Sequence, residues 1–305
     1  MKLSRLLRLY DQGERDFRGV DLSGLDLAGI TLIAVDLTEA NLIGSNLTRA
    51  FLTNSIFNQA KLNWTNFSYA KLSDSSFQNA DLTKANLMGA FMINSTLIAS
   101  KISGANLSNI NLKQSNLQGS NLCGVNGYQA NLREANLKAT NLNWANLSEA
   151  RLTRACLQGA SLTEVNLQKA IMKVVDLQNI DLSRVNLKEA RLSGSNLKRV
   201  NFTQAKLARS RLRWTNLNQA NFYQANLFQA ALEQANLSQA CFQEADLTEA
   251  NLSGANIQGA IWKNACLSDA IISPTHERSR CPLEPLAFPK PNNDDNEDIA
   301  YDVAL

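Results

Sequence analysis

The chain has 305 residues, of which 45% are hydrophobic and 19% are charged, and its formal net charge is +3. So small a charge does not by itself indicate nucleic acid or an anionic membrane as a partner, because such binding needs a concentrated basic patch. No segment approaches the ~18 consecutive apolar residues of a transmembrane helix, and the first residues lack the pattern of a secretory signal. We therefore expect a cytoplasmic protein that makes no membrane contact.

The residues that usually carry chemistry are few and scattered. The five cysteines show no paired spacing, which argues against a disulfide framework or a zinc site; they are Cys123, Cys156, Cys241, Cys266 and Cys281. The single histidine, His276, lies near the C-terminus, so it offers no Ser-His-Asp or Cys-His arrangement within the rest of the chain. No glycine-rich phosphate-binding motif occurs. The sequence predicts no enzyme, no cofactor and no metal site.

Residues 1–16 form the first predicted segment. Leu3, Leu6, Leu7 and Tyr10 are spaced as on one side of a short helix. A stacked β-structure exposes unpaired backbone groups at its ends and needs a cap. We expect this helix to cover the start of the region that follows.

Residues 17–272 repeat with a period of five. Of the 52 positions reached by stepping from Phe17 to Ile272, 38 are Leu, and only Gly127 is not a large apolar residue. The residue two before each of these centres is mostly small, and the residue between them is Asn or Asp in 31 cases. This period fits neither an amphipathic helix nor an ordinary strand. The chain must turn a corner after each unit and stack coil upon coil.

The unit resembles that of the pentapeptide repeat family, with AlaAsnLeu at 85–87, 105–107, 135–137, 145–147, 225–227 and 235–237. The resemblance implies an all-β fold, a right-handed quadrilateral β-helix, in which four units form one square coil. Centres and the small residues two before them would point inward, and the other three residues would face solvent. The 52 units then make about 13 coils, roughly 60 Å long at ~4.8 Å per coil.

This register predicts the stacking of particular residues. One column runs from Leu22 to Phe202, Phe222, Phe242 and Trp262, so large rings gather toward the C-terminal end. A second column carries Asn in eight successive coils, from Asn46 to Asn186, and predicts a ladder of amide hydrogen bonds. Trp262, Ile271 and Ile272 are expected to finish the core.

The glycine at one centre interrupts the core pattern. Gly127 would leave a hole between Leu107 and Leu147 that the neighbouring Tyr128 could fill. A local irregularity is the favoured interpretation, with a ligand niche as the alternative.

Basic residues gather between 184 and 213, where the only acid is Glu189. This basic girdle would be about one and a half coils high, and on the face centred at 32 plus multiples of 20 it extends upstream to Arg133 and Lys113. Clustered arginines beside an exposed aromatic residue suit an acidic protein surface or a nucleic acid. The alternative is a solvated surface with no partner. The candidate partner-binding residues are Arg151, Arg154, Lys173, Arg184, Lys188, Arg191, Lys198, Arg199, Lys206, Arg209, Arg211, Arg213 and Trp214.

Residues 273–305 differ in composition from the repeats. They hold all five prolines and an acidic run at 292–298, a composition that predicts a disordered tail. A short partner motif at 299–305 is the alternative to a merely solubilising tail.

Three functional hypotheses follow from these features. A non-enzymatic interaction scaffold or regulator with a protein partner fits the repetitive faces best, as a monomer or an end-to-end homodimer. Gyrase protection through DNA mimicry, an activity known in the family that the chain resembles, needs an acidic surface, whereas residues 17–272 carry 23 basic and 17 acidic residues. Nucleic-acid binding through the girdle is the third hypothesis, and it predicts an affinity that falls steeply with salt.

Overall fold

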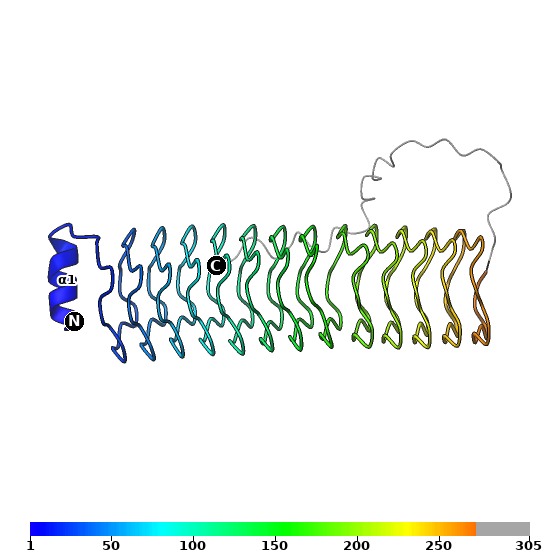
Figure 1. Ribbon diagram of the computed structural model, residues 1–305, viewed down its shortest axis with the longest axis horizontal. Helices are drawn as coiled ribbons and strands as arrows, with labels where there is room; N and C mark the ends of the chain where they lie inside the picture. Colours follow the sequence, from blue (N-terminus) through cyan, green and yellow to red (C-terminus); the bar gives the residue numbers. More distant parts are fainter. Residues whose placement is uncertain (273–305) are drawn as a thin grey trace, which may run out of the picture. The chain divides into compact units, whose positions relative to one another are not determined.

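Residues 1–272 are described by the structure, a computed structural model. One helix, α1 (Leu3–Asp11), precedes a stack of coils (Figure 1). One residue of a five-residue unit forms a parallel bridge to the residue 20 positions later, from Asp16 with Asp36 to Asn251 with Ile271, with the exception of Ser161 and Asp181. Four units therefore make one coil, and the fold is the right-handed quadrilateral β-helix that the sequence predicts. Within the described residues, no helix is both long and apolar enough to span a membrane.

A tight turn ends each unit and starts the next. The N–H of Ala40 donates to the C=O of Leu37 (3.0 Å), and the N–H of Glu39 donates to Asn58 in the next coil (2.8 Å). Every fifth residue from 19 to 269 has a positive φ, between 52° and 71°. Most of these residues are not glycine, and each then costs of order 1 kcal/mol in a left-handed conformation. Hydrogen bonds between coils hold the backbone there.

The coils present four faces. Faces A, B, C and D hold the units centred at residues 17, 22, 27 and 32, and at every twentieth residue after each. On each face the residue before a centre belongs to the first row and the residue after it to the second row. The next residue along is a corner residue, which leads to the following face.

Aromatic rings fill two parts of the core. On face B, Phe202, Phe222, Phe242 and Trp262 stack in sequence, with ring centroids 5.0, 4.8 and 4.5 Å apart. This column is the one that the period predicts. A second cluster was not predicted: Phe57 stacks on Phe77 at 4.7 Å, and Phe67 meets both rings edge-on from the opposite face.

The core hole expected at Gly127 does not exist. The side chain of Leu147 occupies it, because a Cβ added to Gly127 would lie 2.7 Å from Leu147 Cδ2. Tyr128 remains outside, 37% exposed, and its hydroxyl donates to Glu149 Oε2 (3.2 Å). The prediction that Tyr128 fills the hole is therefore wrong. The side chain of Leu147, from the next coil, occupies the space that a side chain at position 127 would take.

The amide ladder on face C is confirmed except at two steps within residues 1–272, between Asn46 and Asn66 and between Asn106 and Asn126, where no side-chain amide hydrogen bond joins the coils. Six bonds join an Asn Nδ2 to the Oδ1 one coil earlier, from Asn46 to Asp26 (2.8 Å) through Asn186 to Asn166 (3.0 Å). The same oxygens also accept backbone N–H groups of their own unit, as Asn106 does from Ser108 (3.1 Å). Each Asn thus stabilises both its turn and the contact between coils.

The N-terminal helix covers the first coil as predicted. Leu6 is buried, and Leu3, Leu9 and Tyr10 pack partly buried against the core. The hydroxyl of Tyr10 accepts the N–H of Ile33 (3.1 Å). The prediction for Leu7 is wrong, because its side chain faces solvent.

The last described coil is less well covered than the others. Trp262 lies against Phe242 and is half-buried. Ile271 is a first-row residue and points outward, 53% exposed, so its predicted place in the core is wrong. Ile272 is also exposed, because no later coil among the described residues covers it. The predictions for the tail, for His276 and Cys281, and for residues 299–305 lie outside the described residues.

Candidate docking face

The basic girdle is spread around the whole β-helix. Arg184 lies at the corner that leads from face B to face C, while Lys188 and Lys206 lie on face C. Lys198 is in the second row of face A, and Arg199 is at the corner that follows it. A flat partner can contact only one face and its two corners. The structure therefore does not bring these residues together with those of face D.

Hydrogen-bond ladders hold three of the girdle arginines along the corners. Arg184 Nε donates to Gln204 (3.0 Å), and the ladder continues through Gln224 to Glu244. A shorter ladder runs from Arg199 through Gln219 to Gln239. A third joins Arg209, Gln229 and Glu249. Sequence reasoning missed these ladders, although comparison of residues 20 apart could have found them.

Face D gathers the remaining basic residues. Between residues 151 and 213 this face carries no acidic residue. Basic side chains on both rows of one face reinforce a single electrostatic potential. The residues of this face that the sequence singled out are Arg151, Arg191 and Arg211 in the first row, Lys173 and Arg213 in the second, and Arg154 and Trp214 at the corner that leads to face A.

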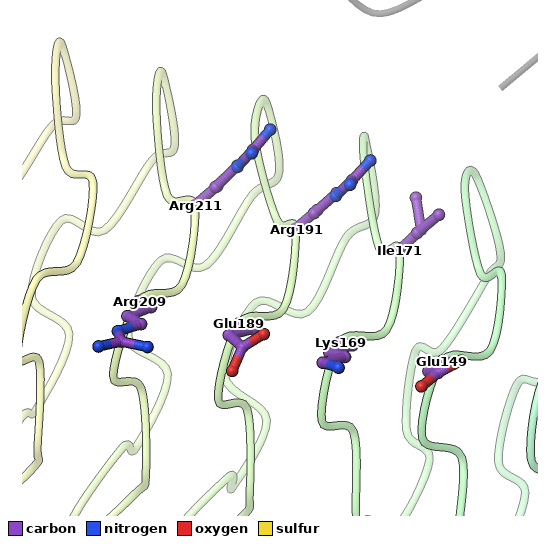
Figure 2. Close-up of a pocket in the computed structure, with 7 residues that line it drawn as sticks. All are labelled: Glu149, Lys169, Ile171, Glu189, Arg191, Arg209 and Arg211. Atoms are coloured by element: carbon purple, nitrogen blue, oxygen red, sulfur yellow. The ribbon is translucent and has the colours of Figure 1, made fainter. Parts of the chain in front are cut away.

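The corner between faces C and D is electrically balanced. Its residues alternate in sign along the stack: Glu149, Lys169, Glu189 and Arg209 (Figure 2). They line a shallow depression together with Ile171, Arg191 and Arg211 of face D. Opposite charges one coil apart, about 4.8 Å, offset one another. The positive potential therefore begins at the first row of face D.

Arg191 and Arg211 form the centre of this face. They are bridged neighbours in adjacent coils, and their side chains extend in the same direction (Figure 2). Neither guanidinium group has a hydrogen-bond or ion-pair partner among residues 1–272. Like charges directly opposite each other on neighbouring strands are destabilising. An anionic group that binds both guanidinium groups would relieve this repulsion through charge-assisted hydrogen bonds.

An ion pair bounds the basic face on its C-terminal side. Arg213 Nη2 lies 2.7 Å from Glu233 Oε1, which also accepts the amide of Asn251 (3.0 Å). Glu233 is the next second-row residue, and its side chain is only 17% exposed. The charge of Arg213 is thus partly compensated, whereas those of Arg191 and Arg211 are not.

Apolar side chains stand at the corner between faces D and A. Trp214 is 55% exposed and Val174 is 43% exposed, with Gly194 between them in the stack. Val174 has φ 55° and is the β-branched residue among the corner residues with positive φ. A β-branched residue rarely adopts this conformation, and such strain often marks a functional position. Sequence reasoning singled out Trp214 but missed Val174 and Gly194.

The carboxyl groups with shifted pKa values lie away from face D. The pKa of Asp16, in the first coil, is lowered to about 2 because Arg18 donates hydrogen bonds to its carboxylate. Within residues 1–272, no three His, Cys, Asp or Glu side chains are grouped as metal ligands would be. Cys156, Cys241 and Cys266 are first-row residues of faces A, B and C.

Comparison with known proteins defines the family. A model described as "Pentapeptide repeat region" matches residues 30–107, and one described as "Pentapeptide repeats (8 copies)" matches eight overlapping segments between residues 92 and 273. These matches cover most of the chain. The chain belongs to the pentapeptide repeat family. A search of curated protein sequences found no match.

Several solved structures are similar. HetL, a pentapeptide repeat protein involved in heterocyst differentiation regulation from the cyanobacterium Nostoc sp. strain PCC 7120, is 29% identical over 88% of this chain and 96% of its own, with a TM-score of 0.27. QnrB1, a plasmid-mediated fluoroquinolone resistance protein, is 16% identical over 76% and 89%, with a TM-score of 0.31. Rfr23 from the cyanobacterium Cyanothece 51142 is 23% identical over 55% and 97%, with a TM-score of 0.19. The family assignment rests on the family models.

Proposed function

We propose that this chain is a non-enzymatic interaction scaffold that presents face D of its β-helix to a protein partner. The observation that supports it most is the pair Arg191 and Arg211, two parallel and unpaired guanidinium groups on a face without acids between residues 151 and 213. Arginine and tryptophan are the residues most often found at the centres of protein interfaces. The partner would carry a complementary acidic surface.

The backbone suits a scaffold because it is held in every coil. Nearly every centre that is followed by a described coil donates its N–H to that coil, as Leu192 does to Arg211 (2.8 Å), and most first-row residues donate back to the previous coil, as Arg191 does to Ala170 (2.9 Å). The exceptions are the centres Leu157 and Leu162 and the first-row residues Asp176 and Asp181. A surface that is already ordered loses little conformational entropy on binding. The positive sign of face D also weighs against mimicry of DNA, which needs negative charge.

The test compares two variants that lose the same charge from the same coils. In the first, Arg191→Gln and Arg211→Gln remove the face D pair. In the second, Lys188→Gln and Lys206→Gln remove two charges from face C, where both side chains are exposed. Each protein, with the unchanged chain beside it, is immobilised and exposed to extract of the native cell, and retained proteins are identified by mass spectrometry.

We expect a saturable protein partner to be retained by the unchanged chain and by the face C variant, and to be lost from the face D variant. Equal loss in both variants would show that overall charge, not face D, is responsible. If nuclease treatment of the extract abolishes retention, the partner is a nucleic acid. The same holds if affinity falls steeply with salt and the salt dependence is weaker in the variant that lacks the two arginines. Any of these results would contradict the proposal.

A further inference from the structure

At the corner between faces D and A, two exposed apolar side chains flank a glycine, and we call the open space between them the slot. Val174, Gly194 and Trp214 occupy the same position in three successive coils, so Val174 and Trp214 stand roughly 10 Å apart along the stack. A Cβ on Gly194 would meet only Val174 Cγ2, at 3.8 Å. The space above Gly194 is therefore open on the side of Trp214. One apolar side chain can enter it between the valine and the indole.

The charged residues of faces D and A, on the two sides of the slot, determine from which face a charged ligand approaches. The second-row neighbours of the slot are Lys173, Ser193 and Arg213, and the first row beyond them holds Arg191 and Arg211.

On face A, the nearest charged residue of the first row is Asp176, whose Oδ1 already accepts the amide of Asn196 (2.9 Å). Face A also carries Lys198 in its second row, but face D holds more basic side chains beside the slot, so an acidic chain would be attracted mainly toward face D.

We infer that the slot takes one large apolar side chain of an acidic peptide segment, whose carboxylates lie on Arg191 and Arg211. The inference rests on the proposed docking face and adds the partner's chemistry: an extended, acidic segment with a Leu, Ile, Phe or Trp anchor. Burial of such an anchor supplies affinity, and the carboxylates supply orientation and a faster association. In this arrangement the strained and exposed Val174 forms one wall of the slot.

The experiment uses the full chain and a random library of twelve-residue peptides displayed on phage. Enriched peptides are synthesised, and their affinities are measured by fluorescence anisotropy for the unchanged chain and for Gly194→Asn. Asn fills the slot without changing the turn, because Asn94 holds the same position at φ 56°. Gly119→Asn is the control, since that corner is open and lies between faces A and B.

We expect the enriched peptides to combine acidic residues with a large apolar one, and to bind Gly194→Asn at least tenfold more weakly while Gly119→Asn leaves their affinity unchanged. Replacement of the apolar anchor by Ala should cause a similar loss. Peptides that are neutral or basic, equal affinity for both glycine variants, or no enrichment at all would overturn the inference.

A further variant separates this inference from the proposed function. If the peptides lose affinity on Arg191→Gln with Arg211→Gln but not on Gly194→Asn, face D still binds an acidic partner and only the slot is wrong. If neither change matters, both ideas fail. Displacement of the peptides by a random-sequence DNA duplex at physiological salt would show that the face serves nucleic acid, and would also overturn the inference. Circular dichroism of every variant checks that the β-helix is retained.

Discussion

Two buried serines should respond differently to the same substitution. Ser195 and Ser210 both lie at inward positions two residues before a centre, and both are at most 2% exposed. The hydroxyl of Ser195 donates to the C=O of Met172 (2.9 Å) and accepts the N–H of Val175 (3.1 Å). The hydroxyl of Ser210 has no hydrogen-bond partner. The comparison therefore isolates the hydrogen bonds of a buried hydroxyl.

The expected magnitudes follow from these contacts. In Ser195→Ala, the loss of the bond to Met172 costs about 1 kcal/mol, and the side-chain partner of the Val175 N–H disappears, so the total destabilisation is about 1–3 kcal/mol. In Ser210→Ala, a buried and unpaired hydroxyl is removed, so the free energy of unfolding should stay the same or rise by up to about 1–2 kcal/mol. The same inward column already carries Ala190 and Ala230, so the smaller residue fits.

Urea denaturation followed by circular dichroism measures both changes. Long repeat proteins do not always unfold in two states, so native-state hydrogen exchange of the Val175 amide is measured as well. Its protection should fall in Ser195→Ala and stay unchanged in Ser210→Ala. If Ser210→Ala lowers the urea midpoint as much as Ser195→Ala does, the hydroxyl of Ser210 has a partner in solution and the reasoning is wrong.

Two further changes test the core and the acid side of the stability curve. Gly127→Leu restores the usual centre residue, and we expect the free energy of unfolding to rise by about 1–3 kcal/mol as Leu147 withdraws; a lower urea midpoint would show that Leu147 cannot move. Burial alone would raise the pKa of Asp81, but hydrogen bonds from Thr83 outweigh it and lower the pKa. A lowered folded-state pKa contributes stability above the unfolded-state value, which is lost as the pH falls through the folded-state value. Asp81→Asn should therefore lose less stability than the unchanged chain when titrated below pH ~4, and identical acid titrations would refute this.

The five-residue period predicted a stack of coils, and the resemblance to the pentapeptide repeat family implied that four units make each coil, so that each unit contacts mainly the units 20 residues away. Periodicity of one apolar and one small residue therefore determines which side chains point inward, where the corners lie and how columns such as Phe202 to Trp262 stack. The amide ladder follows from the same register, since Asn in the same row of successive coils brings an amide NH2 group beside the amide oxygen of the coil before it.

Only the tertiary structure decided how individual side chains are used. It showed that the side chain of Leu147 fills the space beside Gly127. It also showed that Leu9 rather than Leu7 packs against the core in the N-terminal cap. Arg184 and Arg199 donate hydrogen bonds to corner residues of the next coil, whereas the guanidinium group of Arg191 has no such partner among the described residues. These outcomes depend on rotamers, which are set by neighbours in adjacent coils and by competition for hydrogen bonds. The five-residue period places a residue on a face; the contacts around it determine whether its charge or apolar surface remains available to a partner.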